Sequence, residues 1–225
     1  SPSNPHGSVA SLDYLKEAIL LARKYNFILA VDECYCDIFR MNRPKPPGAL
    51  EAAASLGKGL DKLIIFNSLS KRSNASGMRA GFIAGDKNII ESYKLLVSNG
   101  ASPVPIPIQK VAASLYADEE HHTKACIHYD KNFSIVEKYL KPFYKDFKLP
   151  DAGFFLWLKV KDDQQAAKIL WNKFSLRVMP GSFMGKDING VNPGNGFLRI
   201  SLVDNKDVIE ETMKRIQLFL QSEIS

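Results

Sequence analysis

Residues 63–85 read LIIFNSLSKRSNASGMRAGFIAG, and this stretch decides the class of fold. An apolar, β-rich run leads into small hydroxyl residues around Lys71, and a second such run begins near Arg79. Apolar runs of this length that are bounded by serine and glycine are typical of strands. We therefore predict two strands, joined by a polar segment that carries Lys71.

The residues before this stretch predict a helix and another strand. Residues 11–26 place apolar side chains at helical spacing (Leu12, Leu15, Ile19 and Ala22), with Ser11 as the N-cap. The run FILAVDE follows directly at residues 27–33. A continuous apolar run of strand length is typical of a parallel strand covered on both faces. Asp32 would then end that strand.

Helical patterns at 86–97 and 106–117 continue the alternation of strands and helices, which favours an α/β sheet. Such sheets bind ligands beyond the carboxyl ends of their strands, where Asp32 and Lys71 fall. From residue 119 the pattern changes to a long helix that ends near Pro142, three strands, and two further helices. We predict two domains, residues 1–118 and a smaller α+β domain at residues 119–225.

Composition and charge argue against several partners. The net charge of +6 is spread along amphipathic segments, which argues against nucleic acid. No apolar stretch approaches the roughly 20 residues of a membrane span, and no leader pattern opens the sequence, so we expect no membrane partner and a cytoplasmic location.

The cysteines and the paired histidines do not suggest a metal site. Cys34, Cys36 and Cys126 lack a second pair at ligand spacing, so we predict reduced, structural cysteines and no metal. His121 and His122, near the start of the long helix, also lack partners at ligand spacing. We expect both histidines to face solvent.

The residue types around Lys71 suit one kind of chemistry. An amine at the mouth of a sheet can form an imine with an aldehyde, although most lysines are simply solvated. The hydroxyls of Ser68 and Ser70 and the guanidinium of Arg79 can hold a phosphate, although serines and glycines also favour turns. Asp32 could keep a pyridine nitrogen protonated, and Tyr35 could donate to a ring oxygen or merely pack.

Four motifs in order carry a family resemblance. NPHG at 4–7, DECY at 32–35, SLSK at 68–71 with GMRAG at 77–81, and LRISL at 198–202 resemble the fold type I, class I/II aminotransferases that use pyridoxal phosphate. The resemblance implies a three-layer α/β/α large domain, incomplete here, plus a small α+β domain. It further implies amino-acid and keto-acid substrates and a homodimer.

The resemblance also implies a role for each matching residue. Asn4 and Tyr35 would bond the cofactor's ring oxygen, and Asp32 its ring nitrogen. The phosphate would lie against Ser68, Ser70 and Arg79. Lys71 would hold the cofactor covalently and later move a proton at the substrate Cα, and Arg199 would bind the substrate α-carboxylate.

Further segments resemble one branch of that family, the N-succinyldiaminopimelate aminotransferases. They include LPDAGFFLWLKV at 149–160, VMPGSFMG at 178–185 and GVNPGNGFLRISLV at 190–203. This finer resemblance implies transamination between glutamate and an N-succinyl-amino-oxoheptanedioate in lysine and diaminopimelate biosynthesis. Another aminotransferase, for aspartate, alanine or aromatic acids, and a carbon–sulfur β-lyase are the nearest alternatives.

The turn-rich start, SPSNPHG, and the family's usual length imply that the chain is the carboxyl-terminal part of a longer enzyme. The resemblance places a Gly-containing phosphate loop and a ring-stacking aromatic in the missing part. We expect this fragment alone to be inactive. A non-enzymatic, cofactor-binding regulatory module stays open as a different class of function.

Overall fold

The computed structural model describes residues 1–57, 59–100 and 103–224, and the chain divides into two compact units. The first comprises Ser1–Ser3 and Ser8–Cys126, and the second comprises Asn4–Gly7 and Ile127–Ser225. The division falls within helix α6 (Glu120–Leu140), whereas the boundary predicted at 118/119 lies just before that helix. The assignment of residues 1–118 and 119–225 to domains stays a prediction.

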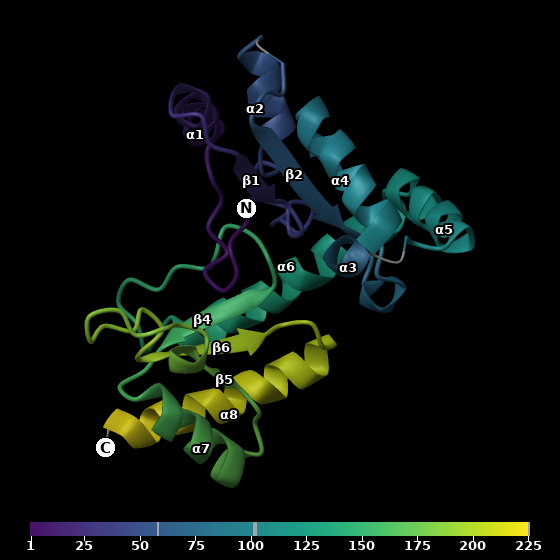
Figure 1. The fold of residues 1–225 in the computed structure, drawn as a ribbon. Helices are drawn as coiled ribbons and strands as arrows, with labels where there is room; N and C mark the ends of the chain where they lie inside the picture. Colours follow the sequence, from purple (N-terminus) through teal and green to yellow (C-terminus); the bar gives the residue numbers. More distant parts are fainter. Residues whose placement is uncertain (58, 101–102, 225) are drawn as a thin grey trace. The chain divides into compact units, whose positions relative to one another are not determined.

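The first unit contains a three-stranded sheet in the order β1-β2-β3. Figure 1 shows β1 and β2 of this sheet. β1 (Leu29–Asp32) runs parallel to β2 (Leu63–Ser68), as predicted, and β3 (Gly81–Gly85) runs antiparallel to β2. β3 begins near Arg79, as predicted, and starts two residues later because Arg79 adopts the left-handed conformation (φ 51°) after the 3₁₀ turn η1 (Ser76–Met78). The left-handed backbone cannot continue into a strand.

Helices α1 (Leu12–Lys24) and α2 (Ala49–Ser55) share one core with the sheet. The Ser11 hydroxyl accepts a hydrogen bond from the Tyr14 N–H, which confirms the predicted cap. This core contains Leu15, Ile19, Ala49, Ala52, Ala53, Leu63 and Ile65. Leu29 and Val31 pack against it, but Ala30 and Asp32 are exposed, so the prediction that this strand is covered on both faces was wrong. The reason is the period of two: alternate β1 side chains point away from α1 and α2.

The remaining helices of the first unit follow the second and third strands. α3 (Leu69–Arg72) directly continues β2, and α4 (Lys87–Gly100) follows β3. α5 (Ile106–Ala117) precedes α6. Both helices predicted from the patterns at 86–97 and 106–117 are therefore present. None of the described helices combines the length and apolar character needed to cross a bilayer.

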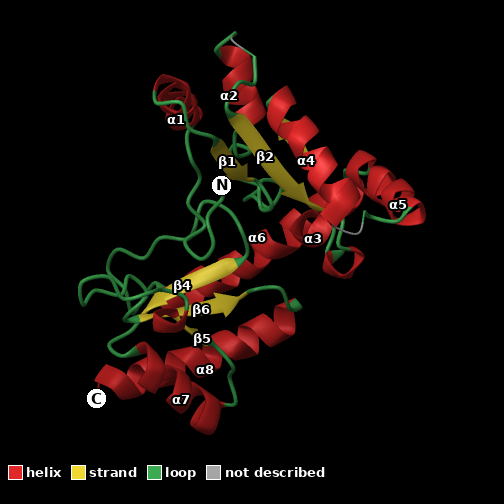
Figure 2. Cartoon of the chain, viewed as in Figure 1, coloured by secondary structure: helices red, strands yellow, loops and turns green. Residues whose placement is uncertain are grey.

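The second unit contains an antiparallel sheet in the order β4-β6-β5. Its strands are β4 (Phe155–Lys159), β5 (Met179–Pro180) and β6 (Phe197–Ser201), joined partly by long loops (Figure 2). α7 (Asp163–Phe174), α8 (Lys206–Ile224) and the later part of α6 share one core with β4 and β6. This core includes Phe133, Leu156, Leu158, Leu170, Leu198, Ile200, Met213 and Phe219.

Alternation along β4 and β6 sends a second set of side chains to the sheet face opposite the helices. On this face Trp157 stacks on Phe197, with ring centroids 5.1 Å apart. The segment Asn4–Gly7 belongs to the same unit, and its His6 ring lies 5.6 Å from Trp157, centroid to centroid. Gly7 has a positive φ of 67°, and an added Cβ there would lie 2.3 Å from the Ala152 carbonyl oxygen. Only glycine fits this turn.

Candidate functional site

Asp32 and Tyr35 follow one another at the carboxyl end of β1. Asp32 is the last residue of the strand, and its exposed side chain points away from α1 and α2. Its Oδ1 accepts a hydrogen bond from the Cys34 N–H at 2.9 Å, which turns the chain. Tyr35, half-buried in this turn, accepts at its carbonyl from the Ile38 N–H. A carboxylate and a phenol are thereby held at one strand end.

Ser68, Ser70 and Lys71 lie at the carboxyl end of β2. Ser68 caps α3: its Oγ accepts from the Ser70 N–H at 3.1 Å and donates to Ser70 Oγ at 2.9 Å. The Ser70 hydroxyl therefore keeps its own proton for another acceptor. Because β1 and β2 are parallel, their carboxyl ends adjoin, and the Lys71 Nζ lies 5.7 Å from the centroid of the Tyr35 ring. The structure thus places the Lys71 amine close to the Tyr35 ring.

Arg79 reaches the same end of β2 through the pairing with β3. Ser68 pairs with Gly81, two residues after Arg79. The exposed Arg79 donates one N–H to the Ser76 carbonyl at 3.0 Å. Its other guanidinium donors have no partner among the described residues. An added Cβ at Gly81 would lie 2.2 Å from the Asn67 carbonyl oxygen, so this close pairing requires glycine.

The other two predicted site residues, Asn4 and Arg199, lie in the second unit and contact each other. Arg199 Nη1 donates to Asn4 Oδ1 at 3.2 Å. The guanidinium carbon also lies 4.7 Å from the centroid of the Phe155 ring. β6 places Arg199 between Trp157 of β4 and Met179 of β5, on the sheet face opposite the core. A residue paired on both sides within a sheet is well fixed for binding a carboxylate.

The structure contains a partly buried ionic cluster, formed by Arg72, Asp37, Lys45 and Glu119, that the sequence did not predict. Arg72, the next residue of α3, is only 4% exposed. Its guanidinium lies 3.1 Å from Asp37 Oδ2 and 2.6 Å from Glu119 Oε1. Burial alone would raise the pKa of Asp37, but Lys45 and Arg72 outweigh it and hold that pKa below its ordinary value. This cluster fixes α3, and with it Lys71, to the start of α6.

The prediction that His121 and His122 face solvent was wrong. His122 is 3% exposed, and its Nε2 donates to the Asp37 carbonyl, to which the Cys126 Sγ also donates at 3.2 Å. His121 is half-buried and bonds the Ser73 hydroxyl at 2.9 Å. The physical reason is tertiary, because the first turns of α6 pack against the turn after β1 and the end of α3. No local pattern reveals such partners.

All three cysteines are unpaired in the structure. Burial, and then the neighbouring Asp32 carboxylate, raise the pKa of the Cys34 thiol to about 11. Burial also raises the pKa of Cys36 to about 12. Within the described residues, no group of three His, Cys, Asp or Glu side chains is arranged to hold a metal ion. These thiols are therefore protonated, packed side chains at neutral pH.

Comparison with known proteins settles the family. A family model described as "Aminotransferase class I and II" matches residues 1–216. The chain belongs to the class I and II aminotransferases. This family is dependent on pyridoxal phosphate, which confirms the predicted cofactor class.

Several curated relatives of this chain are named LL-diaminopimelate aminotransferases. The LL-diaminopimelate aminotransferase 2 of Nostoc sp. is 28% identical over 220 residues, covering 96% of this chain and 54% of that protein. The LL-diaminopimelate aminotransferase of Natranaerobius thermophilus is 30% identical over 224 residues, covering 96% and 54%. The chain thus spans about half the length of the curated relatives it matches.

Solved aminotransferase structures confirm the predicted α/β, fold type I architecture. An aminotransferase from Neisseria meningitidis superposes with a TM-score of 0.90 at 41% identity, covering 97% of this chain and 56% of that one. The aminotransferase AspB from Helicobacter pylori gives a TM-score of 0.88 at 30% identity, covering 98% and 57%.

The donors in the first unit of this aminotransferase chain fit pyridoxal phosphate. The Ser70 hydroxyl proton and the remaining N–H groups of Arg79 suit a phosphate. The amine of Lys71 suits the aldehyde, and Asp32 and Tyr35 on the adjoining strand end suit the ring nitrogen and ring oxygen. Each chemical group of the cofactor therefore has a complementary side chain at the carboxyl ends of β1 and β2.

Proposed function

We propose that the protein containing this chain is a pyridoxal-phosphate-dependent transaminase in which Lys71 holds the cofactor. One observation carries the proposal: the parallel pairing of β1 and β2 brings the Lys71 amine to 5.7 Å from the Tyr35 ring, beside the strand that ends at Asp32. An amine, a phenol and a carboxylate are the three groups that this chemistry needs around the cofactor ring.

Each residue of the first unit has a binding task in this proposal. Ser70 and Arg79 donate to the phosphate, and Ser68 beside them orients the Ser70 hydroxyl. The planar guanidinium of Arg79 supplies paired donors that a lysine could not. Asp32 keeps the ring nitrogen protonated through a charge-assisted hydrogen bond worth roughly 1.5 to 3 kcal/mol. Tyr35 donates to the ring oxygen. When bound, the cofactor supplies an electron-poor ring that stabilises negative charge at the substrate Cα.

Proton transfer and substrate orientation fall to Lys71, Arg199 and Asn4. Lys71, once its amine is free, takes the proton from the substrate Cα and returns it at the cofactor's aldehyde carbon. Arg199 binds the substrate α-carboxylate in a two-point pair. Asn4, whose Oδ1 accepts from Arg199 at 3.2 Å, positions that guanidinium and bonds the ring oxygen.

For the substrate we propose transamination between glutamate and an N-succinyl-amino-oxoheptanedioate. The support is the resemblance of residues 149–160, 178–185 and 190–203 to N-succinyldiaminopimelate aminotransferases. A second candidate, unmodified LL-diaminopimelate, is favoured by the names of the curated relatives. N-succinyl-LL-diaminopimelate, the amine that the first reaction forms from the keto acid, shares a seven-carbon dicarboxylic skeleton with LL-diaminopimelate and differs from it in one succinyl group. The proposal includes a cytoplasmic homodimer, as is typical of the family.

A single-turnover assay tests this proposal. The natural-length protein, loaded with pyridoxal phosphate, is mixed separately with N-succinyl-LL-diaminopimelate, LL-diaminopimelate, glutamate, aspartate and alanine. The visible absorbance of the bound cofactor should fall fastest with the succinylated substrate. Fastest loss with LL-diaminopimelate would select the second candidate, and equal rates with aspartate or alanine would contradict both.

Two variants separate the transaminase from the other classes of function. Lys71→Ala should abolish the absorbance change, because it removes the amine that lies 5.7 Å from the Tyr35 ring centroid. Lys87→Ala, which removes an exposed lysine at the start of α4, should leave the rate unchanged. Release of pyruvate with a thiol from cystathionine would instead indicate a β-lyase. Tight cofactor binding without any turnover would indicate a regulatory module.

A further inference from the structure

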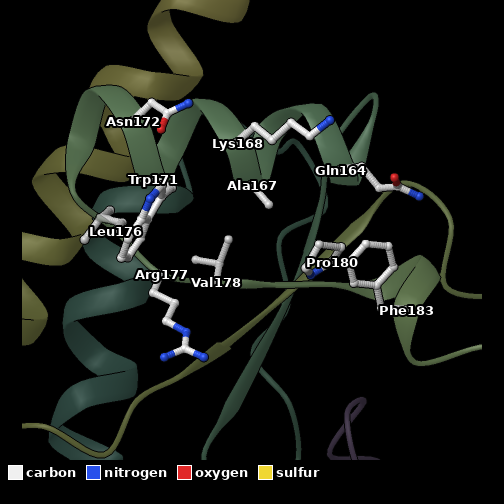
Figure 3. A pocket seen from close by; sticks show the side chains of 10 residues that line it. All are labelled: Gln164, Ala167, Lys168, Trp171, Asn172, Leu176, Arg177, Val178, Pro180 and Phe183. Atoms are coloured by element: carbon white, nitrogen blue, oxygen red, sulfur yellow. The ribbon is translucent and has the colours of Figure 1, made fainter.

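The second unit carries a groove that includes none of the predicted site residues. Helix α7 forms one wall, the segment at residues 176–180 forms the other, and Phe183 of the 3₁₀ turn η2 (Gly181–Phe183) closes one end (Figure 3). Its volume is about 600 Å³. Ala167 points down from the helix toward Val178 on the opposite wall (Figure 3). The groove is thus an elongated slot beside the edge strand β5.

Large apolar side chains stand exposed in this groove. The Trp171 side chain is 60% exposed, and Phe183 is 69% exposed. Trp171 lies beside Leu176 at the end of the groove away from Phe183 (Figure 3). Rings of this size bury a large area on binding, and exposed apolar surface gathered in a concave site marks a ligand site.

The charged side chains that line the groove are all cationic. Lys168 and Arg177 line it, and none of its lining residues is acidic. Neither cation forms an ion pair with a residue that the structure describes. Lys168 extends along α7 toward Gln164, whereas Arg177 turns away from the helix (Figure 3). The slot therefore has an apolar end at Trp171 and a cationic wall at Lys168.

We propose that this groove binds a small amphipathic carboxylate, with an aliphatic chain along the apolar slot and its carboxylate at Lys168. The seven helical steps from Gln164 to Trp171 span roughly 10 Å of helix, which suits a short linear chain. A peptide that adds a strand to the edge of the sheet would fit this groove less well than a small carboxylate. β5 has only two paired residues, and Pro180 has no N–H to offer at the edge.

Fluorine NMR of the natural-length protein labelled with 5-fluorotryptophan tests the site, with octanoate as the probe. The variant Trp171→Phe identifies the Trp171 signal. Octanoate should shift that signal saturably, with a dissociation constant on the order of 1 mM or tighter for a ligand of this size. The Trp157 signal should move far less, because that ring is stacked on Phe197 on the other sheet face.

Matched variants test the charge and the specificity. Lys168→Gln should weaken octanoate binding about two- to fivefold, as expected for an exposed ion pair. Lys173→Gln removes an exposed lysine of the same helix that does not line the groove, and should leave the affinity unchanged. Octan-1-ol should bind several-fold more weakly than octanoate.

Three results would overturn the proposal. They are an unshifted Trp171 signal, equal effects of the two lysine variants, and equal affinities for the acid and the alcohol.

Discussion

Replacing Arg72 with methionine tests the buried cluster that holds the helix of Lys71. The variant removes two ion pairs, with Asp37 at 3.1 Å and Glu119 at 2.6 Å. Glu119 keeps 66% of its side chain exposed and can rehydrate, so its pair contributes at most about 1 kcal/mol. Asp37 is left with Lys45 alone in a site where its side chain is 12% exposed. Breaking a buried pair costs about 3 to 5 kcal/mol, and the remaining lysine reduces this to roughly 2 to 4 kcal/mol.

Urea denaturation followed by circular dichroism measures this loss in a double-mutant cycle. Arg72→Met, Asp37→Asn and the double variant should show a coupling free energy of about 1 to 3 kcal/mol. Lys94→Met serves as the control, because its ion pair with Glu91 lies on an exposed helix face, with 65% and 59% of the two side chains exposed. The control should cost about 1 kcal/mol or less.

The coupling should also depend on pH in a defined direction. The folded-state pKa of Asp37 is lowered, so its stabilisation is complete above the unfolded pKa of about 3.9 and is lost as pH falls through the lower folded pKa. The coupling should therefore stay constant from pH 8 to pH 5 and shrink below about pH 4. Additive effects of the two single variants at pH 7, or a coupling that grows on acidification, would refute the reasoning.

Three further predictions concern other positions. Gly81→Ala should lower the free energy of unfolding by about 1 to 3 kcal/mol in urea, because its Cβ would lie 2.2 Å from the Asn67 carbonyl; a neutral effect would contradict the packing. Asp163→Asn should cost about 1 to 3 kcal/mol, since the buried carboxylate accepts from the Ser182 and Gly196 N–H groups at 2.8 and 3.1 Å; an unchanged midpoint would exclude this role. Cys34, with a pKa of about 11, should react with iodoacetamide at pH 8 at least about tenfold more slowly than free cysteine by mass spectrometry, and equal rates would show that its thiol is not perturbed.

Local patterns predicted most of the secondary structure, because caps, apolar runs and prolines mark where its helices and strands begin and end. Ser11 caps α1, the apolar run to Asp32 forms β1, and the helix predicted after residue 119 ends at Leu140, just before Pro142. The errors concerned exposure, at one face of β1 and at the side chains of His121 and His122. The position at which β3 starts also depends on Arg79, whose left-handed conformation a β-rich pattern does not reveal.

The site residues were predicted from motifs, whereas the residues that support them depend on tertiary contacts. Lys71 and Tyr35 stand 36 positions apart in the sequence, and the parallel register of β1 and β2 brings them together. The sequence did not single out Arg72, and His122 was predicted to face solvent. Their burial arises from Asp37 and the first turns of α6, which no spacing in the sequence connects to them.

The most direct test of the central claim is chemical capture of the cofactor on Lys71. The natural-length protein is loaded with pyridoxal phosphate, reduced with borohydride, digested, and mapped by mass spectrometry. The account predicts the pyridoxyl phosphate mass on the peptide that contains Lys71, and its loss in the Lys71→Ala variant. A label on a different lysine, or a cofactor that borohydride cannot fix to the protein, would contradict it.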